Sequence, residues 1–162
     1  MSIRILPAVK GAITGVLMVA AFLIAYYSDV SSYSPLQYLI YGIYGLGIIW
    51  TLVAYRRSAA FTGKFGDLFS QGFRCFIVVT LIMVIFTFTF SKMHPELAEN
   101  SGEAYRKELL QQKDKLMPDI EKEVANVKKN YNTVVLYGSI FGYLIIGAGV
   151  TAIISGLLTR RK

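Results

Sequence analysis

The sequence carries few of the side chains with which proteins perform acid–base, nucleophilic or metal chemistry. It has one histidine, His94, and one cysteine, Cys75. A structural metal site draws on several Cys and His ligands, and a Ser–His–acid triad needs a serine held in a strained turn. His94 stands beside Pro95 without such a serine, and Cys75 follows an arginine and precedes an apolar run. We therefore expect no catalytic residue, metal site, cofactor or internal disulfide, and we predict that the protein is not an enzyme.

The apolar residues are gathered into blocks long enough to cross a lipid bilayer. Hydrophobic residues make up 54% of the 162-residue chain, and a membrane-spanning helix needs about 20 consecutive apolar residues. The four blocks are residues 7–27, 36–55, 69–90 and 133–158. The predicted fold class is all-α: one integral membrane domain, residues 1–162, built as a bundle of four transmembrane helices. A cleaved signal peptide is the alternative for the first block, but "FLIAYY" stays apolar where a cleavage site would interrupt it.

Basic residues predict the orientation of these blocks. Outside segment 92–132 there are nine basic residues against the acids Asp67 and Asp29, whereas the eight basic and eight acidic residues of that segment cancel. If the blocks alternate in direction, all nine basic residues and Asp67 lie on one side: Arg4, Lys10, Arg56, Arg57, Lys64, Arg74, Arg160, Arg161 and Lys162. Short basic segments stay in the cytoplasm. We predict that both termini are cytoplasmic, and we attribute the net charge of +7 to this topology rather than to a nucleic-acid partner.

Segment 92–132 is polar overall but contains an apolar stripe at helical spacing. The stripe consists of Leu109, Leu116, Ile120, Val124 and Val127. Because the segment leaves and rejoins the same membrane face, we predict an extracytoplasmic helical hairpin that turns near Pro118, with Asn100 and Glu103 as the capping box of its first helix. We expect the two stripes to pack against each other and the second helix to continue into the last block. Helices lying on the membrane surface, or a stripe that docks a partner, are the alternatives.

Ionisable residues are scarce inside the four blocks. We group Lys10 with the cytoplasmic basic residues, and Arg74 lies near the start of the third block, which leaves the depth of the membrane without charged side chains. Ion-coupled transporters and proton relays need such groups at depth. Hydroxyls such as Thr80, Thr151 and Ser155 remain, and we interpret them as structural groups bonded to their own or a neighbouring helix.

Phenylalanine recurs at every fourth position of "FTGKFGDLFSQGF", at Phe61, Phe65, Phe69 and Phe73. Residues four apart share one face of a helix, and Asp67 is placed to cap the start of the third block. Lys64 and Arg74 can reach anionic headgroups while the rings lie at the acyl boundary. The pattern predicts an interfacial helix start at the inner membrane surface; a lipid- or partner-binding wedge is the alternative.

Small residues predict where helices approach each other closely. Gly11-x-x-x-Gly15 in the first block and Gly138-x-x-x-Gly142 in the last have the spacing that allows such packing. The second block has a notched face at Gly42, Gly45 and Gly47, and the bulky third block is predicted to fill notches of this kind. The same glycines could equally face another subunit.

The order of features resembles the family of domain of unknown function 4199 (DUF4199). The resemblance rests on two spans, the loop "FTGKFGDLFSQGF", a third span ending near "HPEL", a charged helical segment and a glycine-rich last span ending "LLTRRK". It covers nearly the whole chain and implies a small four-pass protein of a bacterial inner membrane. The family carries no assigned activity, so the resemblance implies no functional residues.

Two functions remain open from the sequence. The first is a non-catalytic scaffold or accessory subunit that binds a protein partner, or another copy of itself, through its spans or its hairpin. The alternative is a transporter or channel for a neutral or lipid-like substrate, which would need a continuous hydroxyl-lined cavity between the spans. In both, membrane lipid is the one partner that the sequence predicts directly.

Overall fold

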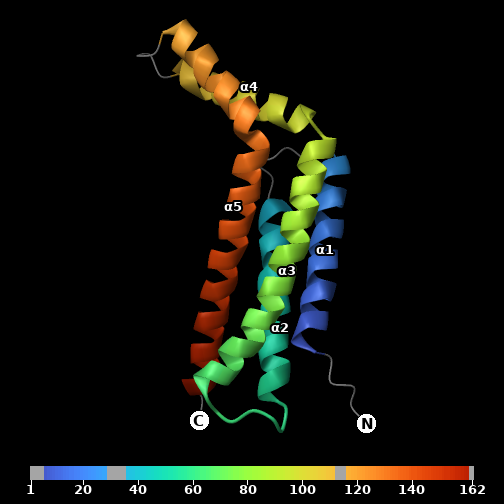
Figure 1. Ribbon diagram of the computed structural model, residues 1–162. Coiled ribbons are helices and arrows are strands. Elements are labelled where there is room, and N and C mark those ends of the chain that lie inside the picture. Colours follow the sequence, from blue (N-terminus) through green and yellow to red (C-terminus); the bar gives the residue numbers. More distant parts are fainter. Residues whose placement is uncertain (1–5, 29–35, 112–115, 161–162) are drawn as a thin grey trace. The chain divides into compact units, whose positions relative to one another are not determined.

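The described part of the chain is entirely helical in its regular elements. The computed structural model describes residues 6–28, 36–111 and 116–160, and within them lie five helices (Figure 1): α1 Pro7–Tyr27, α2 Leu36–Arg56, α3 Phe65–Met93, α4 Glu96–Gln111 and α5 Met117–Arg160. All except α4 are long and apolar enough to cross a membrane. The all-α prediction with four candidate spans is therefore confirmed. Arg4, Asp29, Arg161 and Lys162, which the topology prediction also uses, lie outside the described residues.

The chain divides into two compact units. The first consists of residues 1–83 and 140–162, and the second of residues 84–139. The first unit thus holds α1, α2, most of α3 and the last part of α5, and the second holds the end of α3, α4 and the first part of α5. Each unit is described by itself below.

Local sequence explains where the helices begin and end. Pro7 occupies the first turn of α1, where its missing N–H is not needed. Gly63, with φ of 83°, turns the chain just before α3, because glycine adopts this conformation without steric cost. The α3 helix ends at Met93, two residues before Pro95. Pro118 lies in the first turn of α5, as predicted for a helix start.

Two local predictions differ from the structure. The α3 helix begins at Phe65 rather than near residue 69, so Asp67 lies within its first turn and accepts a hydrogen bond from the Thr62 hydroxyl instead of capping it. Asn100 is not a cap, because α4 begins at Glu96, directly after Pro95; a proline followed by acids is the stronger start signal. The turn predicted near Pro118 precedes α5, which begins at Met117, but residues 112–115, between the two helices, lie outside the described residues.

The first unit differs from a water-soluble domain in the side chains that it buries and exposes. Its interior holds hydroxyl side chains together with apolar ones: Thr14, Thr51, Thr80, Thr151 and Ser155 are all buried. Large aliphatic side chains face outward, among them Val16, Leu46, Leu81, Ile145 and Ile153, each more than half exposed. Soluble proteins rarely expose contiguous apolar surface of this kind. This exposed apolar surface is suited to contact with lipid chains.

Glycines set the close contacts within the first unit. A Cβ added to Gly11 would lie 2.5 Å from the Cys75 carbonyl oxygen, and one added to Gly15 would press on Ile82. Gly47 of α2 faces Thr14 of α1 in the same way, while Gly147 of α5 receives Tyr44 and Phe76. The predicted close packing at Gly11 and Gly15 is thus found between α1 and α3. Gly138, Gly142, Gly42 and Gly45 have no such neighbour.

A glycine contact that brings backbones together can be tested by adding one methyl group. We expect Gly11→Ala to destabilise the protein by about 1–3 kcal/mol, because the methyl group would meet a backbone oxygen that cannot move aside. Gly149→Ala is the matched control, since nothing lies within 4 Å of its added Cβ; it should be neutral or stabilising by up to about 1 kcal/mol. Unfolding by SDS in mixed micelles, followed by circular dichroism, measures both. Equal effects would contradict the described contact between α1 and α3.

Candidate functional site

In the second unit, α4 and the first part of α5 form an antiparallel helical hairpin. Arg106 donates to Glu121 at 3.3 Å, and the Tyr105 hydroxyl donates to Glu123, also at 3.3 Å. Lys128 pairs with Glu99 further from the turn. Higher-numbered residues of α5 pair with lower-numbered residues of α4, as they must when two helices run in opposite directions. These ion pairs are largely exposed, so each stabilises the hairpin only slightly.

The predicted apolar stripe of the hairpin divides into a buried part and an exposed part. Leu109, Ile120 and Val124 form a buried cluster, and Tyr105 packs against it. Val127 is half-buried. Leu116, by contrast, is 72% exposed. The expectation that the two stripes pack on each other is thus met by three of its five residues, and the core of the hairpin is supplied by its own two helices.

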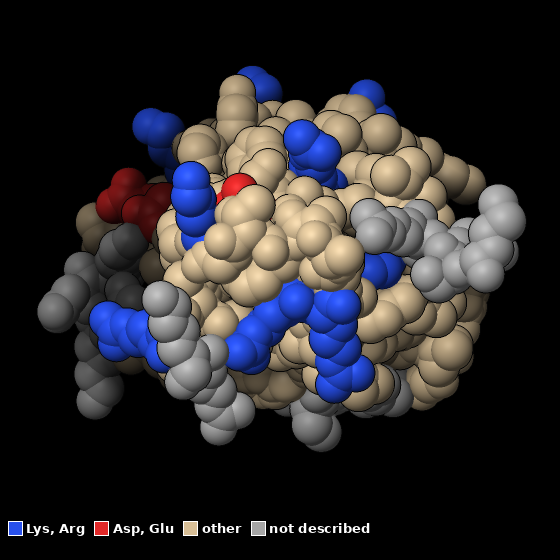
Figure 2. All heavy atoms as spheres, turned by 90° about the horizontal axis from the view of Figure 1, so that it is seen from below, with Lys and Arg blue, Asp and Glu red and all other residues tan. Residues whose placement is uncertain are grey.

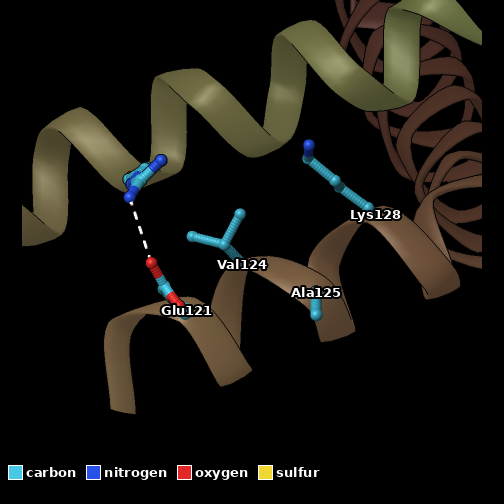
Figure 3. Close-up of a pocket in the computed structure, with 5 residues that line it drawn as sticks. Glu121, Val124, Ala125 and Lys128 are labelled. Atoms are coloured by element: carbon cyan, nitrogen blue, oxygen red, sulfur yellow. Dashed lines mark hydrogen bonds and ion pairs between the residues drawn. The ribbon is translucent and has the colours of Figure 1, made fainter. Parts of the chain in front are cut away.

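A shallow groove runs along the hairpin beside this core. It has a volume of about 200 Å³ and is lined by Arg106, Glu121, Val124, Ala125 and Lys128. Figure 3 shows Val124 and Lys128 extending toward α4, with the ion pair of Glu121 at one end. Both cations already have carboxylate partners, Glu121 for Arg106 and Glu99 for Lys128. The groove therefore offers no uncompensated charge to a ligand.

The stem of Lys128 also fixes how the two helices of the hairpin meet. A Cβ added to Gly102 would lie 2.5 Å from Cε of Lys128 and close to Cγ and Cδ as well. The methylene stem of this lysine therefore crosses α4 over a residue without a side chain, and its ammonium continues to Glu99. A long side chain thus covers apolar surface while its charged head stays at the surface.

Large apolar side chains are left exposed on either side of the hairpin turn. Leu110 is 48% exposed, Leu116 72% and Met117 57%. None of the three belongs to the buried cluster of Leu109, Ile120 and Val124. We call Leu110, Leu116 and Met117 the tip set.

In the first unit, polar side chains meet where α1, α2 and α3 pack most closely. Thr14 donates to the Lys10 carbonyl at 2.8 Å, and Thr51 donates to the Gly47 carbonyl at 2.9 Å. The Thr51 oxygen also lies 3.3 Å from the sulfur of Cys75. Because a hydroxyl has one hydrogen, the consistent arrangement is that the Cys75 thiol donates to Thr51. We call this group, with Lys10, the three-helix junction.

Lys10 is the feature of the junction that the sequence prediction missed. It was grouped with the basic residues that flank the membrane, but it lies in the first turns of α1, is only 8% exposed, and its ammonium stands 5.3 Å from the centre of the Trp50 ring. A cation over the face of an aromatic ring is attracted by the ring quadrupole. The position of Lys10 within the first apolar block was the signal in the sequence that could have predicted its burial.

The four predicted phenylalanines lie in two different segments. Phe61 lies outside α3 and packs edge-on against Tyr55, so the four phenylalanines do not form one helical stripe; only Phe65, Phe69 and Phe73 belong to the helix. The turn at Gly63 is the physical reason.

Histidine and hydroxyl side chains follow the sequence predictions in part. His94 precedes α4, lies 2.6 Å from a carboxylate oxygen of Glu96 and stacks near Phe90. Thr14 and Thr51 bond to their own helices, as predicted for structural hydroxyls. Thr151 and Ser155, however, are buried without a hydrogen-bond partner among the described residues.

One protein family matches the chain. A family model described as "Protein of unknown function (DUF4199)" matches residues 10–161, nearly the whole chain. The chain belongs to the DUF4199 family. No curated protein and no solved structure matches it. The four candidate spans and the charged hairpin are therefore the structural description of this DUF4199 protein on which any function must be built.

The three-helix junction of this DUF4199 protein predicts a protected thiol. Cys75 is fully buried and hydrogen-bonded to Thr51, so we expect N-ethylmaleimide to label it at least about 100-fold more slowly in native membranes than after SDS denaturation, which corresponds to opening about 3 kcal/mol above the native state. Mass spectrometry of the intact chain measures the labelled fraction over time. Comparable rates before and after denaturation would show that α1–α3 do not close over Cys75.

Proposed function

We propose that this DUF4199 protein is a non-catalytic scaffold or accessory subunit that binds a protein partner through its hairpin. In this proposal it is a multi-pass protein of a bacterial inner membrane, with both termini in the cytoplasm and the hairpin outside. The observation that carries the proposal is the tip set: Leu110, Leu116 and Met117 are large and exposed although the hairpin already has a closed core.

The hairpin does not need the tip set for its own folding. Leu109, Ile120 and Val124 bury one another, and the cross-helix pairs set the register. Exposed apolar side chains at the end of a charged element are a common mark of a protein interaction surface. The charges of α4 argue against its insertion into hydrocarbon. A partner with an apolar face would cover the tip set without rearranging the hairpin.

The distribution of charge supports the proposed orientation. Described basic residues at the end of the first unit where α1 begins and α2 ends include Arg57, Lys64 and Arg160, and the acid there, Asp67, is bonded to Thr62. Figure 2 shows Lys and Arg side chains spread around this face and few acidic atoms. Basic segments of this kind favour the cytoplasmic side.

A transporter or channel for a neutral or lipid-like substrate is the second candidate. One observation favours it: Thr151 and Ser155, one turn apart on α5, are buried without hydrogen-bond partners among the described residues. Hydroxyls of this kind could face a polar path. Thr151 also fills the space above Gly72, however, which gives it a packing role that needs no substrate.

Photocrosslinking from the tip set tests the scaffold proposal. We expect a photoreactive amino acid at Leu116, in native membranes, to give a crosslinked protein of one discrete mass. The same residue at Val124 should crosslink only within the chain, because Val124 is 8% exposed and packs in the hairpin core. Mass spectrometry of the products identifies the partner. Crosslinks from Leu116 to lipid alone would instead indicate a hairpin that lies on the membrane.

Substitutions separate binding from folding. Leu116→Asp should abolish recovery of the partner in mild detergent while leaving the helical content unchanged, because Leu116 contributes nothing to the buried cluster. Ile120→Asp places a carboxylate in that cluster and should unfold the hairpin, at a cost of about 3 kcal/mol or more. If Leu116→Asp retains the partner at the wild-type level, the tip set is not the binding surface.

A further inference from the structure

Lys10 is a buried cation for which the described residues supply no counter-ion. Its side chain is only 8% exposed, in a helix that is long and apolar enough to span a membrane. Among the described residues no carboxylate pairs with it, and its ammonium contacts the Trp50 ring. A buried cation without an anion is costly in a medium of low dielectric constant. An anionic group supplied from outside the chain would remove this cost.

The geometry places Lys10 where such a group can arrive. Trp50 is 44% exposed, so the ring that the ammonium contacts reaches the outer surface of the first unit. Arg57 is exposed, and its backbone N–H still bonds to the Val53 carbonyl at 3.2 Å, so the helical path of α2 continues to it. Seven residues separate Trp50 from Arg57, which puts both on one face of α2, about 10 Å apart along the axis.

The same face of α2 offers an apolar track for an acyl chain. Leu46 is four residues before Trp50 and is 66% exposed, and Leu39, seven residues further back, is 52% exposed. Between them Gly42 has no neighbour within 4 Å of an added Cβ, so the track has a notch at its middle. Cationic side chains therefore lie at one end of a continuous apolar face. This arrangement complements a lipid, which has an anionic headgroup at one end of its apolar chains.

We propose that an anionic phospholipid binds here, its phosphate held by Lys10 and Arg57 beside Trp50 and one acyl chain lying along Leu46 and Gly42. The ammonium of Lys10 supplies a point charge and Arg57 a planar fork of donors, both suited to phosphate oxygens. The apolar track selects a lipid over a soluble phosphate, which would leave that face uncovered. The site lies at the end of the first unit where α1 begins and α2 ends, and it is independent of the partner proposed for the hairpin.

Trp50 makes the site directly observable, because it is the only tryptophan of the chain. The purified full-length protein in a neutral detergent is titrated with phosphatidylglycerol or phosphatidylcholine, each brominated on its acyl chains, and quenching of Trp50 emission is measured. A basic residue near a membrane surface strengthens binding of an anionic lipid about fivefold. We expect phosphatidylglycerol to be preferred by at least this factor, and the preference to fall as salt is raised.

Variants assign the preference to its residues. Lys10→Gln and Arg57→Gln should each reduce the preference for phosphatidylglycerol about fivefold, whereas Lys122→Gln, which removes an exposed charge in the second unit, should leave it unchanged. Glycerol 3-phosphate at matched concentration should not displace the lipid; displacement would indicate a site for soluble phosphate compounds instead.

The outcomes that overturn the proposal are equally definite. They are equal quenching by the two lipids in the wild-type protein, an undiminished preference in Lys10→Gln, or a loss in Lys122→Gln as large as in Lys10→Gln. If Lys10→Gln does not fold, as judged by circular dichroism, Arg57→Gln decides, because Arg57 is exposed and takes no part in the core; its full retention of the preference would overturn the proposal.

Discussion

The bundle depends on how closely its helix backbones can approach one another. Lipid chains are as apolar as leucine, so burial of aliphatic surface gives little drive for helices to associate inside a membrane, and packing and hydrogen bonds must provide it. At Gly11, Gly47 and Gly147 the missing side chain is replaced by a neighbouring helix. The hydrogen bonds of Thr14 and Thr51, and that of Tyr44 to the Tyr143 carbonyl at 2.9 Å, lie beside these contacts. Close approach and polar bonding thus occur at the same places.

Much of this architecture could be predicted from the sequence because its signals are local or cumulative. Spans of about 20 apolar residues and Pro7 and Pro118 at helix starts all depend on short stretches of chain. The stripe of Leu109, Ile120 and Val124 was readable because residues three and four apart share a helix face. The same reasoning misplaced Phe61, since a spacing of four predicts one face only if the backbone stays helical, and Gly63 turns the chain.

The site residues were harder to predict because they depend on which helix lies beside which. Whether another helix packs against a glycine pair depends on the helix that lies beside it. Gly11 and Gly15 contact α3. Gly138 and Gly142 have the same spacing, but no atom lies within 4 Å of a Cβ added to either. The contact of the Lys10 ammonium with the Trp50 ring could not be predicted, because a sequence does not show which residues of two helices lie side by side. Leu116 follows the period of the stripe, yet its place beside the turn leaves it without an opposing residue. In each case the missing information is tertiary.

One contact in the hairpin couples two positions of the chain. The stem of Lys128 occupies the space that a side chain at position 102 would need, so the two positions compete for a single volume. A relative that carries alanine or a larger residue at the equivalent of Gly102 must shorten or redirect the residue at 128, and it then loses the reach to Glu99. The spacing of α4 from α5 in the hairpin is therefore set jointly by a glycine on one helix and a lysine on the other.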